Sequence, residues 1–342
     1  MSAREERAQD AAPDASVFEG TVVKLDRGFP LVRFDDGCEV RAEHATSLVK
    51  DKRAGRAVIG DRVKVAVPDG HDKGIIEAVL PRRTAFVRKD PTERALPQTL
   101  AANFDLVLVA QPLEDVNIHR LERELVLAHE AKTPVVVVLT KADLIEDAEQ
   151  VEDIRRRIDS FVGGDRVIVL SGEDPATVQE LADLLAEDGG RQAILIGRSG
   201  VGKSTLVNML VGHELQETTP VREGDGKGRH TTVSREIIPL PQGGSIVDMP
   251  GVRGLGLWDA DDGIGSAFSD VESLAASCQF RDCTHHAEPG CAVRQAVAEG
   301  TLSQRRLESY LRLKEETRQM KRRREEAERI RSRRGHPRRR KG

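Results

Sequence analysis

The 342-residue sequence predicts a multidomain protein: an N-terminal β-barrel, a central α/β domain, and a helical C-terminal domain with a metal site. Three observations predict this order. Five short strand-like segments separated by turn signals fill residues 17–88. Apolar runs then alternate with amphipathic stretches up to about residue 265, as in a parallel sheet covered by helices. Three of the four cysteines fall within residues 278–291.

The predicted barrel follows a polar, acidic lead over residues 1–16, which we expect to be disordered and which lacks the apolar segment of a secretion signal. Five strands in so short a domain favour an OB-fold, a common barrel of this size. A structural barrel and an RNA-binding barrel both remain open. Because aromatic side chains are few, an RNA-binding barrel would use shape and phosphate contacts. The strand-like segments are residues 20–25, 30–34, 38–41, 62–67 and 74–79.

The α/β domain is expected over residues 89–265, after a connector at 88–98 in which Pro91 and Pro97 mark a boundary. Its apolar strands read as nearly continuous, which predicts a sheet buried on both faces. The predicted strands are residues 105–110, 134–139, 166–170 and 193–196, and the predicted helices are about 121–131, 148–161 and 176–186.

A phosphate-binding loop follows the strand at 193–196 and precedes a helix-like stretch, matching the pattern G-x-x-x-x-G-K-[ST]. A simple strand-to-helix turn would explain the glycines but not the Lys-Ser pair after them. The Lys203 ammonium would reach the β- and γ-phosphates as a catalytic group, and the Ser204 hydroxyl would bind Mg²⁺. The predicted phosphate-contacting residues are Gly197, Arg198, Ser199, Gly200, Val201, Gly202, Lys203, Ser204 and Thr205.

The base-reading segment is expected at the carboxyl end of the strand at 134–139, where ligands bind α/β sheets. A carboxylate at Asp143 can accept from both N1–H and the N2 amine of guanine, and adenine lacks that donor pair. Alone, T-K-x-D could be a helix N-cap signal, but beside a phosphate loop it indicates GTP or GDP. Thr140 would tie this segment to the phosphate loop. The expected base contacts are Thr140, Lys141, Ala142, Asp143 and Ser171.

Glycine-rich residues 217–234 are expected to move without a ligand, as switch loops do. Either Thr231 or Thr232 would close on Mg²⁺ and the γ-phosphate. His230 is either a surface histidine or a catalytic residue that positions water.

The strand at 245–247 leads into Asp-x-x-Gly, which fits a Walker-B strand. Asp248 would hold Mg²⁺, and the Gly251 N–H could sense the γ-phosphate. Val252 occupies the place where Ras-like proteins carry a water-orienting glutamine. Hydrolysis should therefore be slow or use another group.

The order of these motifs is circularly permuted, because the base reader precedes the phosphate loop. As a result, the segment that responds to the γ-phosphate leads directly into the C-terminal domain. Nucleotide state could therefore be relayed to that domain.

The C-terminal domain, expected over residues 266–317, contains Cys278-x4-Cys283-x-His285-x5-Cys291. Three thiolates and one imidazole suffice for tetrahedral Zn²⁺ and leave no open position, so we expect a structural site. His286 is the alternative histidine ligand.

The tail at residues 318–342 carries 13 Lys/Arg against 3 Asp/Glu, although the whole chain has a net charge of −4. Such a basic end indicates contact with a polyanion, RNA in the first place. The alternative is a solvated charged helix. A long charged helix capped by Ser303 is expected to run into this tail.

Barrel, motif order and cysteine spacing together resemble the circularly permuted, ribosome small-subunit-dependent GTPase family, often written RsgA or YjeQ. The resemblance covers about residues 17–315, and its most specific local matches are residues 101–103, 228–232, 248–251 and 282–291. It implies a bacterial cytoplasmic GTPase that acts late in maturation of the 30S subunit and is stimulated by that subunit. It also implies that the barrel and the zinc domain contact 16S rRNA. In this family His230 matches the histidine proposed to position water.

The residues also allow two other functions: an RNA-binding module switched by nucleotide with negligible turnover, and a metabolic P-loop kinase. The T-K-x-D segment argues against the kinase. Since no 18-residue apolar run occurs, we expect no membrane span, and we expect a monomer.

Overall fold

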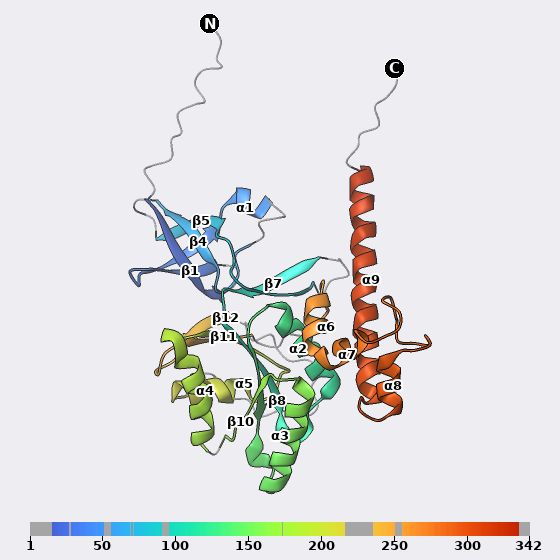
Figure 1. Cartoon of the computed structure of the whole chain (residues 1–342). Helices are drawn as coiled ribbons and strands as arrows, with labels where there is room; N and C mark the ends of the chain where they lie inside the picture. Colours follow the sequence, from blue (N-terminus) through green and yellow to red (C-terminus); the bar gives the residue numbers. More distant parts are fainter. Residues whose placement is uncertain are drawn as a thin grey trace, which may run out of the picture. The chain divides into compact units, whose positions relative to one another are not determined.

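The computed structural model describes residues 16–26, 29–50, 56–68, 70, 72–90, 96–172, 174–215, 235–249 and 255–334. These residues form two compact units (Figure 1). The first contains the described residues up to Arg83, together with residues 101–103 and 235–238. The second contains all the others. In the described part of the chain, no helix is both long enough and apolar enough to cross a membrane.

The first unit is a closed barrel. Its strands pair in the order β1-β2-β3-β5-β4, and β4 pairs back onto β1. This confirms the predicted OB-like barrel. A short helix, α1 (Thr46–Lys50), follows β3. The barrel strands are β1 (Ser16–Asp26), β2 (Phe29–Phe34), β3 (Glu39–His44), β4 (Arg62–Val67) and β5 (Lys73–Val79).

The barrel closes around small branched side chains. Val22, Val32, Val63 and Ile76 have no exposed surface, as expected where alternate residues of each strand point inward. A strand that the sequence did not predict, β12 (Arg235–Pro239), pairs antiparallel with β1.

The second unit is built on a parallel sheet in the order β10-β9-β8-β11-β13. The chain moves outward from β8 to β9 and β10, then returns to the other side of β8 as β11. Because the strands are parallel, their carboxyl ends meet at one edge, and the order reverses between β8 and β11. The strands are β8 (Leu106–Pro112), β9 (Val135–Thr140), β10 (Arg166–Val169), β11 (Gln192–Ile196) and β13 (Ser245–Asp248).

The burial of the strands and the positions of the helices both agree with the sequence prediction. Every residue of β9 is buried, and so are the first six residues of β8, as predicted for a sheet covered on both faces. Short 3₁₀ turns, η1 (Leu113–Asp115), η2 (Ala142–Leu144) and η3 (Glu187–Gly189), link some of these elements. The α-helices are α2 (Ile118–Glu130), α3 (Ala148–Val162), α4 (Ala176–Ala186) and α5 (Lys203–Val211).

Strands reach into both ends of the connector expected at residues 88–98. β6 (Ala85–Lys89) and β7 (Pro97–Ala102) form a two-stranded sheet, and residues 91–95 lie outside the described part. Pro97 is the first residue of its strand, a position where a missing N–H is tolerated.

The C-terminal helices belong to the same compact unit as the parallel sheet. They are α6 (Asp261–Ala267), α7 (Ser269–Ala275), α8 (Ala292–Ala298) and α9 (Gln304–Arg334). The Ser303 hydroxyl accepts from the Arg306 N–H at 3.1 Å, so the predicted cap is present. Residue 318, where the basic tail was expected to begin, lies inside α9, and residues 335–342 lie outside the described part.

A buried arginine joins these helices to the sheet. Arg306 stacks between the rings of Phe161 and Phe268, at 4.6 and 4.0 Å from their centroids. Its guanidinium also pairs with Glu122 of α2 at 3.2 Å and with Asp270 of α7 at 3.1 Å. Helices α2, α7 and α9 therefore share one ion-pair centre, and α3 contributes the Phe161 ring beside it.

Candidate functional site

The phosphate-loop sequence forms a loop between β11 and α5, as the motif requires. Gly197 and Gly202 have φ angles of +152° and +91°, a region that side chains disfavour. A Cβ at Gly197 would lie 2.7 Å from the Ala110 carbonyl oxygen. Glycine is therefore required here by both backbone conformation and space.

Lys203 opens α5 and points back into the loop. Its ammonium donates to the carbonyl oxygens of Gly197 and Arg198, each at 3.1 Å. Burial lowers the pKa of Lys203, and the carboxylates of Asp248 and Glu124 offset this shift only in part.

The T-K-x-D segment lies at the end of β9 and contacts the phosphate loop. Thr140 is buried, and its hydroxyl donates to the Val201 carbonyl oxygen, which is the tie expected from the sequence. Lys141 adopts a left-handed conformation with φ of +62°, which turns the chain into η2. The Asp143 carboxylate accepts from the Gly172 N–H at 2.6 Å, so the segments after β9 and β10 are also joined.

The upstream and downstream segments line one cavity of about 210 Å³. Asp143 and Ser171 come from before the phosphate loop, and Gly202 and Thr205 come from the loop and its helix. The fold thus brings together residues that the permuted sequence separates. The cavity is lined by Thr140, Lys141, Asp143, Leu144, Leu170, Ser171, Gly172, Gly202, Thr205, Leu206 and Met209.

A buried carboxylate lies behind the phosphate loop. Glu124 of α2 accepts from the Gln111 side chain at 2.5 Å and from Arg120 at 2.8 Å. The Gln111 carbonyl oxygen lies 3.2 Å from the same Thr140 hydroxyl that donates to Val201. Burial raises the pKa of Glu124 to about 6, although Arg120, Gln111 and Lys203 favour its ionised form. No pattern in the sequence predicts this network.

The expected Mg²⁺ ligands are only partly within the described residues. Asp248 ends β13 next to β11, where its neighbour Met249 donates to the Leu195 carbonyl oxygen at 3.2 Å. Ser204 lies in the first turn of α5. The remaining switch predictions lie outside the described residues: His230, Thr231, Thr232, Gly251 and Val252.

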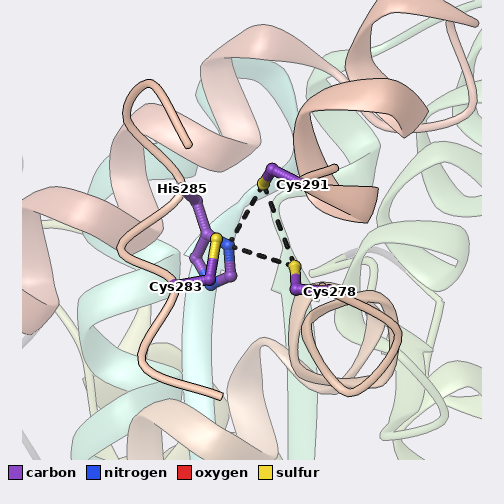
Figure 2. A group of neighbouring side chains, drawn as sticks. All are labelled: Cys278, Cys283, His285 and Cys291. Carbon is purple, nitrogen blue, oxygen red and sulfur yellow. Dashed lines mark hydrogen bonds between the residues drawn. The ribbon is translucent and has the colours of Figure 1, made fainter. Parts of the chain in front are cut away.

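The cysteine motif converges on one point near the start of α8 (Figure 2). His285 Nδ1 lies 3.6 Å from the Cys278 sulfur and 3.4 Å from the Cys291 sulfur, and these two sulfurs are 3.9 Å apart. All four ligand atoms, with Cys283, lie within 4.8 Å of one another. A tetrahedral Zn²⁺ with standard bond lengths requires sulfur–sulfur edges of about 3.8 Å and sulfur–nitrogen edges of about 3.6 Å. The side chains therefore fit a metal ion.

The loop carrying the cluster is organised by Glu288. Its carboxylate accepts from the Thr284 hydroxyl and N–H and from the N–H groups of His286 and Ala287. Hydrogen bonds from Thr284, followed by those from the backbone, lower the pKa of Glu288 to about 2. The His285 imidazole faces the cysteines, so the structure favours it over His286 as the histidine ligand.

Apolar walls of the base cavity are another feature that the sequence analysis missed. Leu206 and Met209 lie one turn apart on α5, and Leu144, which is 55% exposed, directly follows Asp143. The spacing of Leu206 and Met209 on one helix face was a usable signal. An exposed leucine beside a charged motif gave no such signal in the sequence.

Comparison with known proteins agrees with this geometry. Residues 79–258 match the family model described as RsgA GTPase. A small ribosomal subunit biogenesis GTPase RsgA from Streptomyces avermitilis is 43% identical over 296 residues, which cover 86% of this chain and 78% of that protein. Its counterpart from Opitutus terrae is 41% identical over 289 residues, covering 82% and 76%.

Two solved structures share the fold. YjeQ from Thermotoga maritima superimposes with a TM-score of 0.63 at 24% identity, covering 88% of this chain and 99% of that one. YloQ, described as a circularly permuted GTPase, gives a TM-score of 0.61 at 24% identity, covering 89% and 96%. These similarities support a permuted α/β domain with a barrel before it.

Proposed function

Because this chain belongs to the RsgA GTPase family, we propose that it binds GTP and hydrolyses it to GDP and phosphate during late maturation of the small (30S) ribosomal subunit. One observation carries the proposal. Asp143 and Gly202 line the same cavity, although the base-reading motif precedes the phosphate loop in the chain. The cavity is thus lined both by a carboxylate and by the phosphate loop, and a guanine nucleotide requires both.

Guanine selection would rest on Asp143. Its carboxylate would accept from N1–H and the N2 amine, two hydrogen bonds that adenine cannot offer. The Lys141 stem and the Leu144 side chain would cover the faces of the base, and Ser171 would contact its edge.

Phosphate binding would rest on the backbone N–H groups of residues 197–205 and on Lys203. The Lys203 ammonium would exchange its two carbonyl partners for β- and γ-phosphate oxygens. Ser204, Asp248 and one of Thr231 and Thr232 would hold Mg²⁺, which neutralises charge that develops on the phosphates. We propose that His230 positions the attacking water, since Val252 cannot.

The partner would be the 30S subunit, with contacts to its 16S rRNA. Support comes from the names of the curated relatives and from the basic side chains along α9. We further propose that Cys278, Cys283, His285 and Cys291 bind one structural Zn²⁺, and that the protein acts as a cytoplasmic monomer.

The test is steady-state phosphate release with and without purified 30S subunits, on the wild type and on His230→Ala. We expect stimulation of the wild type by the subunit and loss of most of it in the variant. Competition by GDP but not ADP should accompany binding. An unstimulated, negligible turnover with intact GDP binding would instead indicate an RNA-binding module switched by nucleotide.

A further inference from the structure

Helix α2 lies between the nucleotide-binding sheet and the C-terminal helices. It packs on β8 and β9, and it also contacts α6 and α9. Its three consecutive charged residues point to different neighbours. Glu122 pairs with Arg306 of α9, Glu124 pairs with Gln111 of β8, and Arg123, between them, contacts a third segment.

That third contact is a half-buried ion pair with a backbone segment beside it. Arg123 donates to both carboxylate oxygens of Glu316 on α9, at 2.7 and 2.6 Å. The same guanidinium donates to the Leu255 carbonyl oxygen at 3.1 Å, and the Leu257 N–H lies 3.5 Å from the Glu316 carboxylate. We call these four groups the clasp: the side chains of Arg123 and Glu316 and the backbone of Leu255 and Leu257.

The clasp is charged at neutral pH. Burial would raise the pKa of Glu316, but the Arg123 guanidinium and the Leu257 N–H outweigh it and hold the pKa below its usual value. A bidentate guanidinium–carboxylate pair also fixes orientation more tightly than a single point contact. The clasp therefore holds its backbone segment in one position.

The backbone segment held by the clasp lies shortly after Asp248, a predicted Mg²⁺ ligand. Leu255 and Leu257 follow Asp248 by fewer than ten residues and are themselves buried. Just beyond them, Lys321 and Arg324 of α9 pair with Asp259, and Arg324 also lies over the Trp258 ring at 5.9 Å. Because of the permutation, the chain that leaves Asp248 continues through Leu255 and Leu257, the backbone of the clasp, before it reaches the C-terminal helices.

We propose that Arg123 and Glu316 are positioning residues that couple α9 to the segment following Asp248, so that contact of the C-terminal helices with the small subunit changes the rate of GTP hydrolysis. The proposal rests on the proposed function for its subunit-dependent part. A shift of α9 on the subunit moves Glu316, and Glu316 moves Arg123 and the Leu255–Leu257 backbone together. The nucleotide contacts themselves are not altered.

The experiment compares Arg123→Gln, Glu316→Gln and the double variant in the full-length protein. The matched control is Glu180→Gln, which breaks a surface ion pair with Arg166 of similar length, 2.8 Å, away from the clasp. Basal turnover, GDP affinity, zinc content and 30S affinity should stay within about twofold of the wild type. The kcat at saturating 30S should fall about tenfold, within the range of measured coupling factors, with KM unchanged. The double variant should lose no more than either single variant, because both remove one interaction.

Wild-type stimulation in all three variants would overturn the proposal. So would an equal loss of basal and stimulated turnover, because the clasp would then only support the GTPase fold. A loss of 30S affinity at unchanged kcat would make it a binding contact and would overturn the proposal as well.

A second measurement needs no ribosome and separates this inference from the proposed function. Amide hydrogen exchange in α9 should differ at least about threefold between the GDP-bound protein and the protein bound to a non-hydrolysable GTP analogue. Glu316→Gln should abolish that difference, and Glu180→Gln should keep it. If the wild type shows no difference, the coupling is wrong even when 30S stimulates hydrolysis. If the difference is present but 30S has no effect, the proposed function fails and the coupling stands.

Discussion

Replacing Asp143 by Asn should exchange guanine for xanthine as the preferred base. The Asp143 carboxylate accepts from the Gly172 N–H and lines the cavity beside Ser171. An Asn carbonyl oxygen can keep the bond to N1–H and the bond from Gly172. Its amide would then face the N2 amine of guanine, two donors with no acceptor between them. Xanthine carries an oxygen at that position and would accept from the amide.

The size of the effect follows from the bonds exchanged. A hydrogen bond to a charged group contributes about 1.5–3 kcal/mol, and an opposed donor left unpaired in a cavity costs about 1–3 kcal/mol more. The variant should therefore lose about 2.5–6 kcal/mol of guanine affinity, or roughly 70- to 25,000-fold in Kd. Xanthine nucleotide should bind more tightly than guanine nucleotide by at least about tenfold.

The assay is displacement of a fluorescent GDP or XDP analogue by unlabelled nucleotides. Asp147→Asn is the control, because Asp147 lies nearby in the chain but does not line the cavity. Its carboxylate caps α3 by accepting a hydrogen bond from the Glu149 N–H at 2.9 Å. That control should keep wild-type GDP affinity. If Asp143→Asn binds GDP within about twofold of the wild type, the assignment of the base reader is wrong.

Three further predictions concern buried groups and the metal site. Arg306→Met leaves Glu122, which is 1% exposed, without its arginine partner, so urea unfolding should show a loss of about 3–5 kcal/mol; a loss below about 1 kcal/mol would contradict the ion-pair centre. Burial raises the pKa of Glu124 from 4.5 to about 6, so folding is favoured while this carboxyl is protonated. That contribution to the free energy of unfolding is present below pH 4.5 and is lost as the pH rises through 6. This contribution amounts to about 2 kcal/mol between pH 4.5 and 7, and Glu124→Gln should lack it in thermal melts at different pH. Wild-type and variant stabilities that change in parallel with pH would refute the assignment. Cys291→Ser should lose the bound zinc seen by metal analysis and lower Tm, whereas His286→Ala should retain the metal; zinc loss in His286→Ala alone would reverse the ligand assignment.

Periodicity and motif spacing predicted most of the fold because each signal was local. The strand at 134–139 is a continuous apolar run, and β9 is buried at every residue. The phosphate loop and the cysteine motif are likewise defined by short spacings. In the structure the phosphate loop lines the cavity with the base-reading segment, and the cysteines cluster with His285.

The features that the sequence analysis missed depend on distant partners. β12 has five residues and no signal of its own, and its pairing with β1 joins residues about 210 positions apart. The two-stranded sheet of β6 and β7 was hidden by Pro97, because a proline predicts a connector unless the partner strand is known. Glu124 and Glu316 look like ordinary charged residues on helices, and only the fold shows that each meets a partner from another element.

Circular permutation gives α2 a role that the usual chain order does not provide. In this chain the strand before α2, β8, opens the domain, and the segment after Asp248 closes it. The two ends of the α/β domain therefore meet at α2, where Arg123 contacts Leu255 and Glu316. In the proposed coupling, the effect of the γ-phosphate leaves through the closing end, and the effect of the C-terminal helices enters there. Since both pass one half-buried ion pair, removing it should separate hydrolysis from the subunit without weakening the binding of either ligand.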